Sequence, residues 1–232
     1  MNNKNKTVAI ILSAGSGTRM GMGETKQTIA ILGKSVLYRC LQAFEESSSI
    51  DSIVVVYRDG EYDFVNNECR FLKKPFTLVK GGKCRAESAS FGFASVCDSA
   101  DYVMIHDGAR CLITPQEIDR VAEFTYKYGA ATASKIITDT VKKCGSDGKI
   151  TATLTRSELR LVQTPQASSV KLYKEALKSA PVLNESITDD NMLLENIGIQ
   201  PYCVDTSSEN IKITTREDLL LAEFIIKKRE EH

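Results

Sequence analysis

Short apolar segments alternate along this chain with segments of helical periodicity. Thr7–Leu12, Ser52–Tyr57 and Tyr102–His106 are continuous apolar runs, which is typical of strands buried on both faces. Ser35–Glu46 and Pro115–Tyr128 carry their apolar residues on one helical face. Repeated strand–helix alternation indicates βαβ units. It therefore predicts a Rossmann-like α/β fold, in which a mostly parallel sheet carries helices on both faces.

The same patterns predict the remaining elements. Further strands are expected at Phe76–Val79, Ala130–Ser134 and Gln200–Val204, and further helices at Glu61–Leu72, Arg85–Val96, Val170–Ala180, Asp189–Glu195 and Thr215–Lys228. Ser35 and Thr114 are suited to cap their helices, and Pro115 to the first helical position. No repeat or low-complexity linker divides the 232 residues, so we expect a single domain over residues 1–232.

The alternation breaks over residues 136–156. Thr138–Thr155 consists of two polar, alternating segments around the turn Gly145–Gly148, which predicts a hairpin. Few large apolar side chains lie on it, and isolated two-stranded hairpins are marginally stable. The segment is therefore either an ordinary surface hairpin or a protruding arm that packs against a second subunit.

Composition excludes several classes of function. The 30 basic and 30 acidic side chains balance, so nothing favours nucleic acid or a membrane surface as a partner. No apolar run of about 18 residues occurs, and the polar start MNNKNK lacks the apolar region of a secretory signal. Seven cysteines form no C-x-x-C pair and only two histidines occur, which argues against a zinc site or a disulfide framework. We expect a cytoplasmic protein with reduced thiols.

The stretch LSAGSGTRMGMGETKQ directly follows the first expected strand. Its glycines let a ligand approach bare backbone N–H groups, which favour anions, and Arg19 and Lys26 add positive charge. The combination suits a polyphosphate. GSGTRMG is one residue too long for a dinucleotide fingerprint, and Thr28 replaces the first glycine of a P-loop ending at Gly33-Lys34-Ser35. A plain glycine-rich turn with solvent-facing charges remains an alternative.

Four more polar stretches stand out. HDGAR follows the strand Tyr102–His106, LVQTPQA is expected to be a polar turn, SITDD opens a helix that Thr188 is expected to cap, and ENIKITT follows the last strand. Each has an ordinary structural explanation. A lone His106 is expected to form local hydrogen bonds rather than bind a metal. Asp107-Gly108 can form a simple turn, and Lys212 can be a solvated side chain.

Taken in order, LSAGSGTRMG…TKQ, KGGKCRAES, HDGAR, LVQTPQA, SITDD and NIKITT resemble the 2-C-methyl-D-erythritol 4-phosphate cytidylyltransferase family. The resemblance runs from Thr7 to Ile226. It implies a nucleotidyltransferase fold and a reaction of CTP with a sugar-alcohol phosphate that gives a CDP-alcohol and pyrophosphate. That reaction requires charge neutralisation and positioning of two polyanions. It needs no covalent nucleophile, which agrees with the lack of a Ser-His-Asp or Cys-His set.

The resemblance also implies residue roles. The catalytic groups would be Arg19, Lys26 and Lys212, and the nucleotide pocket would be lined by Ala14, Gly15, Gly17, Gly81, Gly82 and Ser88. The acceptor would be held by Asp107, Arg110, Thr140, Arg156, Thr164 and Thr188. Mg²⁺ would bridge phosphate oxygens, with Asp107 either near the ion or orienting the acceptor. Thr140 and Arg156 lie on or beside the arm, where relatives reach into a partner's site, so the resemblance favours a homodimer.

Two alternatives remain. Ribitol-5-phosphate cytidylyltransferases share the fold and most motifs, although the TDD of Thr188–Asp190 and the GAR of HDGAR favour the methylerythritol enzymes. A nucleotide-binding module without turnover would tolerate the loss of the three candidate catalytic cations, all of which are present. The chain departs from the family pattern at Thr25, Cys111 and Ser168, where proline, proline and an aromatic residue are usual. The loss of two prolines is expected to loosen two loops of the site.

Overall fold

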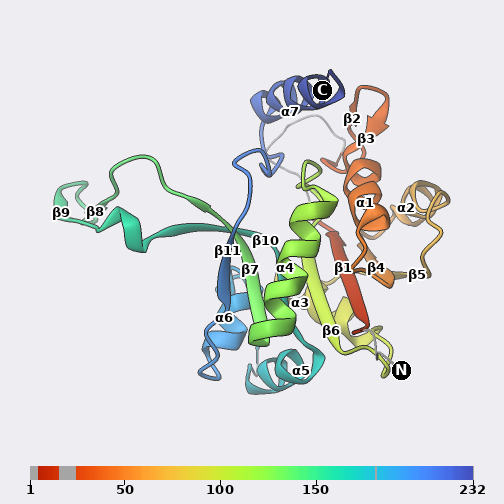
Figure 1. The fold of residues 1–232 in the computed structure, drawn as a ribbon, viewed down its shortest axis with the longest axis horizontal. Helices are drawn as coiled ribbons and strands as arrows, with labels where there is room; N and C mark the ends of the chain where they lie inside the picture. The colour runs from red at the N-terminus through yellow and green to blue at the C-terminus, as the bar shows by residue number, and fades with distance from the viewer. Residues whose placement is uncertain (1–4, 16–24, 181, 232) are drawn as a thin grey trace.

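A seven-stranded sheet forms the centre of the protein (Figure 1). The computed structural model describes residues 5–15, 25–180 and 182–231. The sheet has the order β11-β7-β10-β6-β1-β4-β5, with β1 at Thr7–Ser13, β4 at Ser52–Tyr57, β5 at Phe76–Lys80, β6 at Tyr102–Asp107, β7 at Ala130–Ile136, β10 at Arg160–Ser169 and β11 at Tyr202–Asp205. All neighbouring strands pair in parallel except β10, which is antiparallel to β6 and β7. The prediction of a mostly parallel α/β sheet is confirmed.

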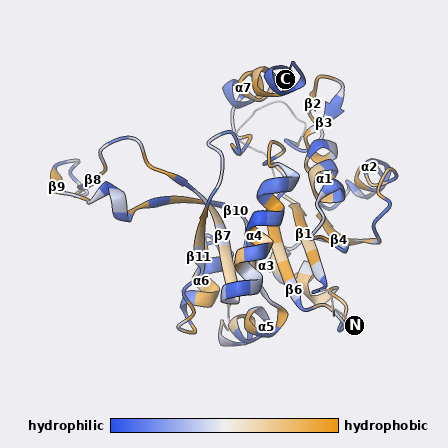
Figure 2. Ribbon diagram, in the orientation of Figure 1, coloured by the Kyte–Doolittle hydropathy of each residue, from blue (hydrophilic) through white to orange (hydrophobic). Residues whose placement is uncertain are grey.

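Helices pack on both faces of this sheet. They are α1 at Val36–Glu46, α2 at Tyr62–Glu68, α3 at Arg85–Ala94, α4 at Pro115–Tyr128, α5 at Val170–Ser179, α6 at Asp190–Glu195 and α7 at Arg216–Glu230. Side chains of β1 alternate between the two faces. Ala9 and Ile11 join the core that includes α1 and α4, whereas Val8 and Ile10 join the core that includes α3, α5 and α6. Figure 2 shows the resulting apolar strands beneath amphipathic helices.

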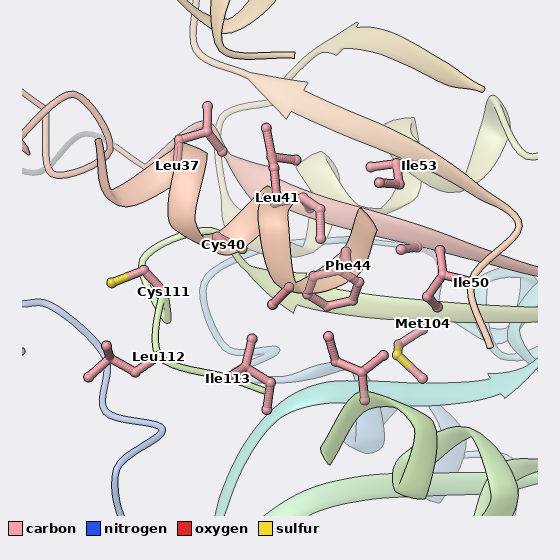
Figure 3. Close-up of a cluster of buried hydrophobic side chains, with 14 of the residues drawn as sticks. Leu37, Cys40, Leu41, Phe44, Ile50, Ile53, Met104, Cys111, Leu112 and Ile113 are labelled. Carbon is pink, nitrogen blue, oxygen red and sulfur yellow. The ribbon is translucent and has the colours of Figure 1, made fainter. Parts of the chain in front are cut away.

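The larger core is built around α1. Leu37, Cys40, Leu41 and Phe44 recur at helical spacing and are fully buried (Figure 3). Phe44 packs against the ring of His106 with the ring centroids 5.0 Å apart, so this core extends to the end of β6. The residues that recur at helical spacing in the sequence are thus the residues that α1 buries.

Helix starts follow the expected capping chemistry at two of three positions. Ser35 caps α1 by accepting from the Tyr38 N–H, and Thr114 caps α4 in a capping box ahead of Pro115. The expectation that Thr188 caps the helix after SITDD is wrong. Asp189 is the cap of α6, and its carboxylate accepts from the Met192 N–H. The Thr188 hydroxyl instead donates to the Met192 sulfur at 3.1 Å.

The interpretation of LVQTPQA as a polar turn is also wrong, because the segment lies within β10. Gln163, Thr164 and Gln166 are buried there, and each finds hydrogen-bond partners inside the protein. The pairing of β10 with β7 shifts register between Val162 and Gln166, around Pro165, which has no N–H to give to the ladder. A two-stranded ribbon of β2 (Ala30–Ile31) and β3 (Lys34–Ser35) was also not expected.

The predicted hairpin is present and extends away from the sheet (Figure 1). It contains β8 (Lys142–Cys144) and β9 (Ile150–Thr153), followed by a short 3-10 turn at Arg156–Glu158. Both strands are exposed along their whole length. Within the described ranges, no helix is long and apolar enough to cross a membrane.

Candidate active site

A cavity of about 480 Å³ opens at the carboxyl ends of the parallel strands β1, β4, β5 and β6. This is where open parallel sheets bind ligands, because the loops from neighbouring strands meet there. Its lining comes from the ends of these strands, the segments that follow them, the start of α3 and the segment after β11. It comprises Leu12, Ala14, Gly15, Lys26, Gln27, Arg58, Asp59, Gly81, Gly82, Lys83, Cys84, Arg85, Ser88, Asp107, Ala109 and Lys212. Segments far apart in the sequence thus form one site.

The structure brings together most of the residues expected to bind nucleotide. Ala14, Gly15, Gly81, Gly82 and Ser88 all line the cavity. Gly17 and the candidate catalytic Arg19 lie outside the described residues. Lys26 and Lys212, the other two candidate catalytic groups, line the same cavity.

Close packing between two loops explains the glycine at position 81. A Cβ atom on Gly81 would lie 2.4 Å from the Ala14 Cβ, closer than real Cβ contacts come. The Gly81 N–H donates to the Tyr57 carbonyl at 2.8 Å, and the Gly82 N–H donates to the Ser88 hydroxyl at 3.0 Å. Ser88 therefore fixes the turn that precedes α3, while Gly81 lets the loop after β1 approach it.

Asp107 is the central anion of the site. Its carboxylate oxygens lie 3.1 Å from Arg85 Nε and 2.7 Å from Lys212 Nζ. Burial alone would raise the pKa of this carboxyl group, but the charges of Arg85 and Lys212 outweigh burial and hold the pKa well below its usual value of 3.8. Asp107 is therefore ionised at neutral pH, and it holds the Lys212 ammonium at the cavity.

His106 supports this arrangement from the buried side. Its Nε2 lies 3.1 Å from the Arg110 carbonyl, which only accepts, so Nε2 carries the proton. Burial lowers the pKa of His106 to about 4, although the hydrogen bond to Arg110 opposes the shift. The neutral ring then accepts at Nδ1 from the Thr164 hydroxyl, 3.1 Å away. The Asp107 N–H donates to that same hydroxyl at 3.0 Å.

The expected acceptor residues occupy different places. Asp107 lines the cavity, whereas Thr164 is buried behind it and its hydroxyl is used to hold Asp107 and His106. Arg110 donates to the Asn210 carbonyl at 2.9 Å, and burial lowers its pKa. Thr188 is exposed and outside the cavity lining. Acceptor binding by these residues stays a prediction.

Thr140 and Arg156 lie on the exposed arm, away from the cavity lining of their own chain. Arg156 donates to the Thr138 carbonyl, and Arg156 and Thr138 border an open hollow at the base of the arm. If Thr140 and Arg156 act on an acceptor, the acceptor lies in another subunit's cavity.

Sequence reasoning assigned no role to Arg85, Asp190 and Asn210, which organise the site. Arg85 bridges Asp107 and Asp190, with its Nη1 2.8 Å from the Asp190 Oδ2. Asn210 is fully buried, and its amide donates to Gln163 Oε1 at 3.1 Å and to the Thr164 carbonyl at 3.0 Å, which anchors the segment carrying Lys212. The sequence carried a signal only for Arg85. A cation at the first position of a helix is disfavoured by the helix dipole, which indicates that Arg85 is held there by other groups.

The described part of the chain offers few donor groups for a metal ion. Among the residues that the structure describes, no group of three or more histidine, cysteine, aspartate or glutamate side chains is placed to hold a metal. Among the residues that the structure describes, the carboxylates in the cavity lining are Asp59 and Asp107. Mg²⁺ usually binds through one or two carboxylates together with substrate phosphates and water. The site therefore fits a magnesium ion carried by a nucleotide better than one held in a protein cage.

Comparison with known proteins agrees with this geometry. The family model of 2-C-methyl-D-erythritol 4-phosphate cytidylyltransferase (IspD) matches residues 7–228. The chain belongs to this cytidylyltransferase family. The enzyme of that name from Pelotomaculum thermopropionicum is 39% identical over 228 residues, covering 97% of this chain and 96% of the relative. The one from Clostridium perfringens is 37% identical over 224 residues, covering 96% of this chain and 99% of the relative.

Solved structures of the family share the fold. The 4-diphosphocytidyl-2C-methyl-D-erythritol synthase of Anaerococcus prevotii superposes with a TM-score of 0.85 at 26% identity, covering 97% of this chain and all of that one. The Francisella tularensis family member gives a TM-score of 0.79 at 28% identity, covering 95% of this chain and 99% of that one. The predicted nucleotidyltransferase-type fold is confirmed across nearly the whole chain.

Proposed function

We propose that this protein transfers the cytidylyl group of CTP to 2-C-methyl-D-erythritol 4-phosphate, releasing pyrophosphate, as an enzyme of isoprenoid precursor biosynthesis. The observation that carries the proposal is the cavity at the strand ends, where Lys26 and Lys212 lie beside backbone glycines in a chain of this family. Such a site suits a polyphosphate, because cations and open N–H groups both favour anions.

The reaction needs little covalent chemistry from the protein. An oxygen of the acceptor phosphate attacks the α-phosphorus of CTP, a new P–O bond forms, and the bond to the β-phosphate bridging oxygen breaks. Lys26 lines the nucleotide side of the cavity and stabilises charge on the triphosphate, together with Arg19. Lys212, held by Asp107, meets the acceptor phosphate. Each preorganised cation of this kind typically contributes about 10²-fold or more to the rate.

Mg²⁺ belongs to this proposal as an ion that enters with the nucleotide. When bound, it would neutralise negative charge on the phosphates of the transferred group. Of the described residues, Asp107 and Asp59 are the carboxylates of the cavity lining and hence candidate ligands. Arg85 and Lys212 already occupy both oxygens of Asp107. The main role of Asp107 is therefore to hold the Arg85 and Lys212 side chains.

Turnover is tested by pyrophosphate release. Purified protein with CTP, Mg²⁺ and methylerythritol phosphate should release pyrophosphate far faster than with CTP and Mg²⁺ alone. A rate independent of the acceptor would instead indicate nucleotide hydrolysis, and CTP binding without any release would indicate a module without turnover.

We further propose a single domain over residues 1–232 that forms a homodimer through the arm of residues 136–156, in a reducing cytoplasm. Exposed apolar side chains support the dimer: Ile136 at the base of the arm is 58% exposed and Ile150 at its far end is 64% exposed. Such side chains, and the unpaired edges of a ribbon, are better covered by a partner. A two-fold contact between identical arms is the commonest solution.

A complementation experiment tests whether the arm enters the partner's site. Lys26→Ala removes a candidate residue from the cavity, and Arg156→Ala removes one from the arm. Each variant should be nearly inactive alone. In a statistical mixture half of the dimers are mixed, and each has one intact site, so activity should recover to about one quarter of wild type. A monomer by light scattering, or no recovery after verified subunit exchange, contradicts the shared site.

A further inference from the structure

Side chains of alternating charge run from the cavity into the core. Lys212 Nζ lies 2.7 Å from Asp107 Oδ2, Asp107 Oδ1 lies 3.1 Å from Arg85 Nε, and Arg85 Nη1 lies 2.8 Å from Asp190 Oδ2. The Tyr173 hydroxyl then donates to Asp190 Oδ1 at 2.7 Å. We call these five residues the Arg85 chain. The Lys212 side chain is 41% exposed at the cavity end, whereas Tyr173 is buried at the other end. The five side chains therefore connect the solvent-exposed cavity to the core.

Arg85 stands at the centre of this chain under unfavourable local electrostatics. It is the first residue of α3, and the dipole of a helix disfavours a cation at its N-terminus. Burial also disfavours its charge, yet the carboxylates of Asp190 and Asp107 raise its pKa above the ordinary value. The position is tolerated because one planar guanidinium reaches two carboxylates in a fixed geometry.

The two carboxylates belong to different parts of the site. Asp107 ends β6 and carries Lys212, whereas Asp190 begins α6 directly after the Thr188–Asp189 pair. The Asp190 N–H donates to Gln166 Oε1 at 2.7 Å, and Gln166 Nε2 donates to Asp189 Oδ2 at 3.1 Å, which ties the start of α6 to β10. Arg85 itself begins the helix that follows the Gly81-Gly82 turn.

We propose that Arg85 is a positioning residue that fixes the nucleotide-binding turn before α3 relative to the acceptor-binding elements at the end of β6 and the start of α6. The inference rests on the proposed cytidylyl transfer. In-line attack requires the acceptor phosphate and the α-phosphorus to approach along one line, and a misplacement of about 1 Å can lower the rate by about 100-fold. A lysine at position 85 keeps the charge but offers a single ammonium, so it cannot hold both carboxylates as the guanidinium does.

The proposal separates Arg85 from a residue that binds nucleotide or only stabilises the fold. A nucleotide contact would weaken CTP binding when removed. A purely structural role would lower the melting temperature and leave the kcat of the folded fraction unchanged. A positioning role lowers kcat and raises the KM for the acceptor while CTP affinity is kept.

The experiment compares three variants with the wild type. Arg85→Lys alters the centre of the chain, and Tyr173→Phe removes the buried hydroxyl at its far end without touching the cavity lining. Tyr126→Phe is the matched control, since its hydroxyl also makes a 2.7 Å hydrogen bond, but to Thr7, outside the chain. For each protein we would measure thermal unfolding, CTP affinity by calorimetry, and kcat and the KM for the acceptor.

We expect Arg85→Lys to keep CTP affinity within about threefold and to lose about 10-fold to 100-fold in kcat. Tyr173→Phe should lower kcat by a smaller factor, and Tyr126→Phe should leave it unchanged. Arg85→Lys within threefold of wild type in kcat and acceptor KM overturns the proposal. So does a loss of CTP affinity equal to the loss of kcat/KM, or a Tyr173→Phe variant that matches Tyr126→Phe. An inactive wild type that still binds CTP would refute the proposed transfer instead, so the two failures are distinguishable.

Discussion

Acidification should destabilise this protein through His106. The ring is fully buried, and burial lowers its pKa to about 4, from 6.5 in the unfolded chain. Between these values the unfolded chain binds more protons than the folded one, so stability falls as the pH is lowered from 6.5 towards 4. At about 1.4 kcal/mol per pH unit, the loss approaches about 3 kcal/mol at pH 4. Above about pH 6.5 the ring is neutral in both the folded and the unfolded chain, so this loss of stability does not occur.

Urea unfolding of the wild type and His106→Gln isolates this effect. Glutamine retains an N–H that can donate to the Arg110 carbonyl, but it does not titrate. Carboxylates away from residue 106 titrate alike in both proteins and cancel in the comparison. Between pH 4.5 and 6, the wild type should therefore lose more unfolding free energy than the variant, by about 1.4 kcal/mol per pH unit.

Nuclear magnetic resonance observes the same group directly. The sequence has one other histidine, His232, so the ring signals come from two residues. The His106 ring should remain neutral at pH 6 with its proton on Nε2. A His106 pKa at or above 6.5, or equal slopes for the two proteins in urea, would refute the hydrogen-bond arrangement of His106, Thr164 and Arg110.

Three further outcomes follow from the cavity. Lys26→Ala should lower kcat by about 10²-fold with unchanged thermal unfolding, and steady-state rates within threefold of wild type would contradict its role. CTP should be used better than UTP by several orders of magnitude, because a site built to pair a polar group rejects an analogue that lacks it; similar rates with both nucleotides would exclude base selection. Gly81→Ala places a methyl group 2.4 Å from the Ala14 Cβ, so it should cost about 1–3 kcal/mol of stability and weaken CTP binding in calorimetry. An unchanged melting temperature would show that the two loops separate freely.

The sequence predicted the parts of the fold that depend on local patterns. The apolar run of β1 and the helical spacing in α1 report burial directly, and Ser35 and Thr114 report the starts of their helices. The site at the strand ends could be expected for the same reason, since parallel strands bring their carboxyl ends to one edge.

The strand β10 could not be predicted from local patterns. Its buried positions hold Gln163, Thr164 and Gln166, which resemble a polar turn in the sequence. Apart from a local hydrogen bond from Gln166 to the Gln163 carbonyl, their side chains bond to distant partners, such as Asn210 and the backbone of Asp107. Burial of polar residues depends on contacts that form in three dimensions, and periodicity carries no information about them.

The cap of α6 and the Arg85 chain could not be predicted from the sequence for a related reason. Thr188 and Asp189 are both suited to cap a helix, and the choice depends on Gln166 of β10, which binds Asp189 and the Asp190 N–H. Arg85 pairs with carboxylates 22 and 105 residues away. Which cations meet which anions at the strand ends is decided by topology, and only the presence of these charges is visible in the sequence.

Competition between two acceptors tests the central claim most directly. The protein would be given CTP, Mg²⁺ and equal amounts of methylerythritol phosphate and ribitol 5-phosphate, and the products would be identified by mass spectrometry. The account predicts that cytidylylated methylerythritol phosphate forms almost exclusively, with one pyrophosphate released for each product. A predominance of CDP-ribitol, or the absence of both products in a protein that binds CTP, would contradict it.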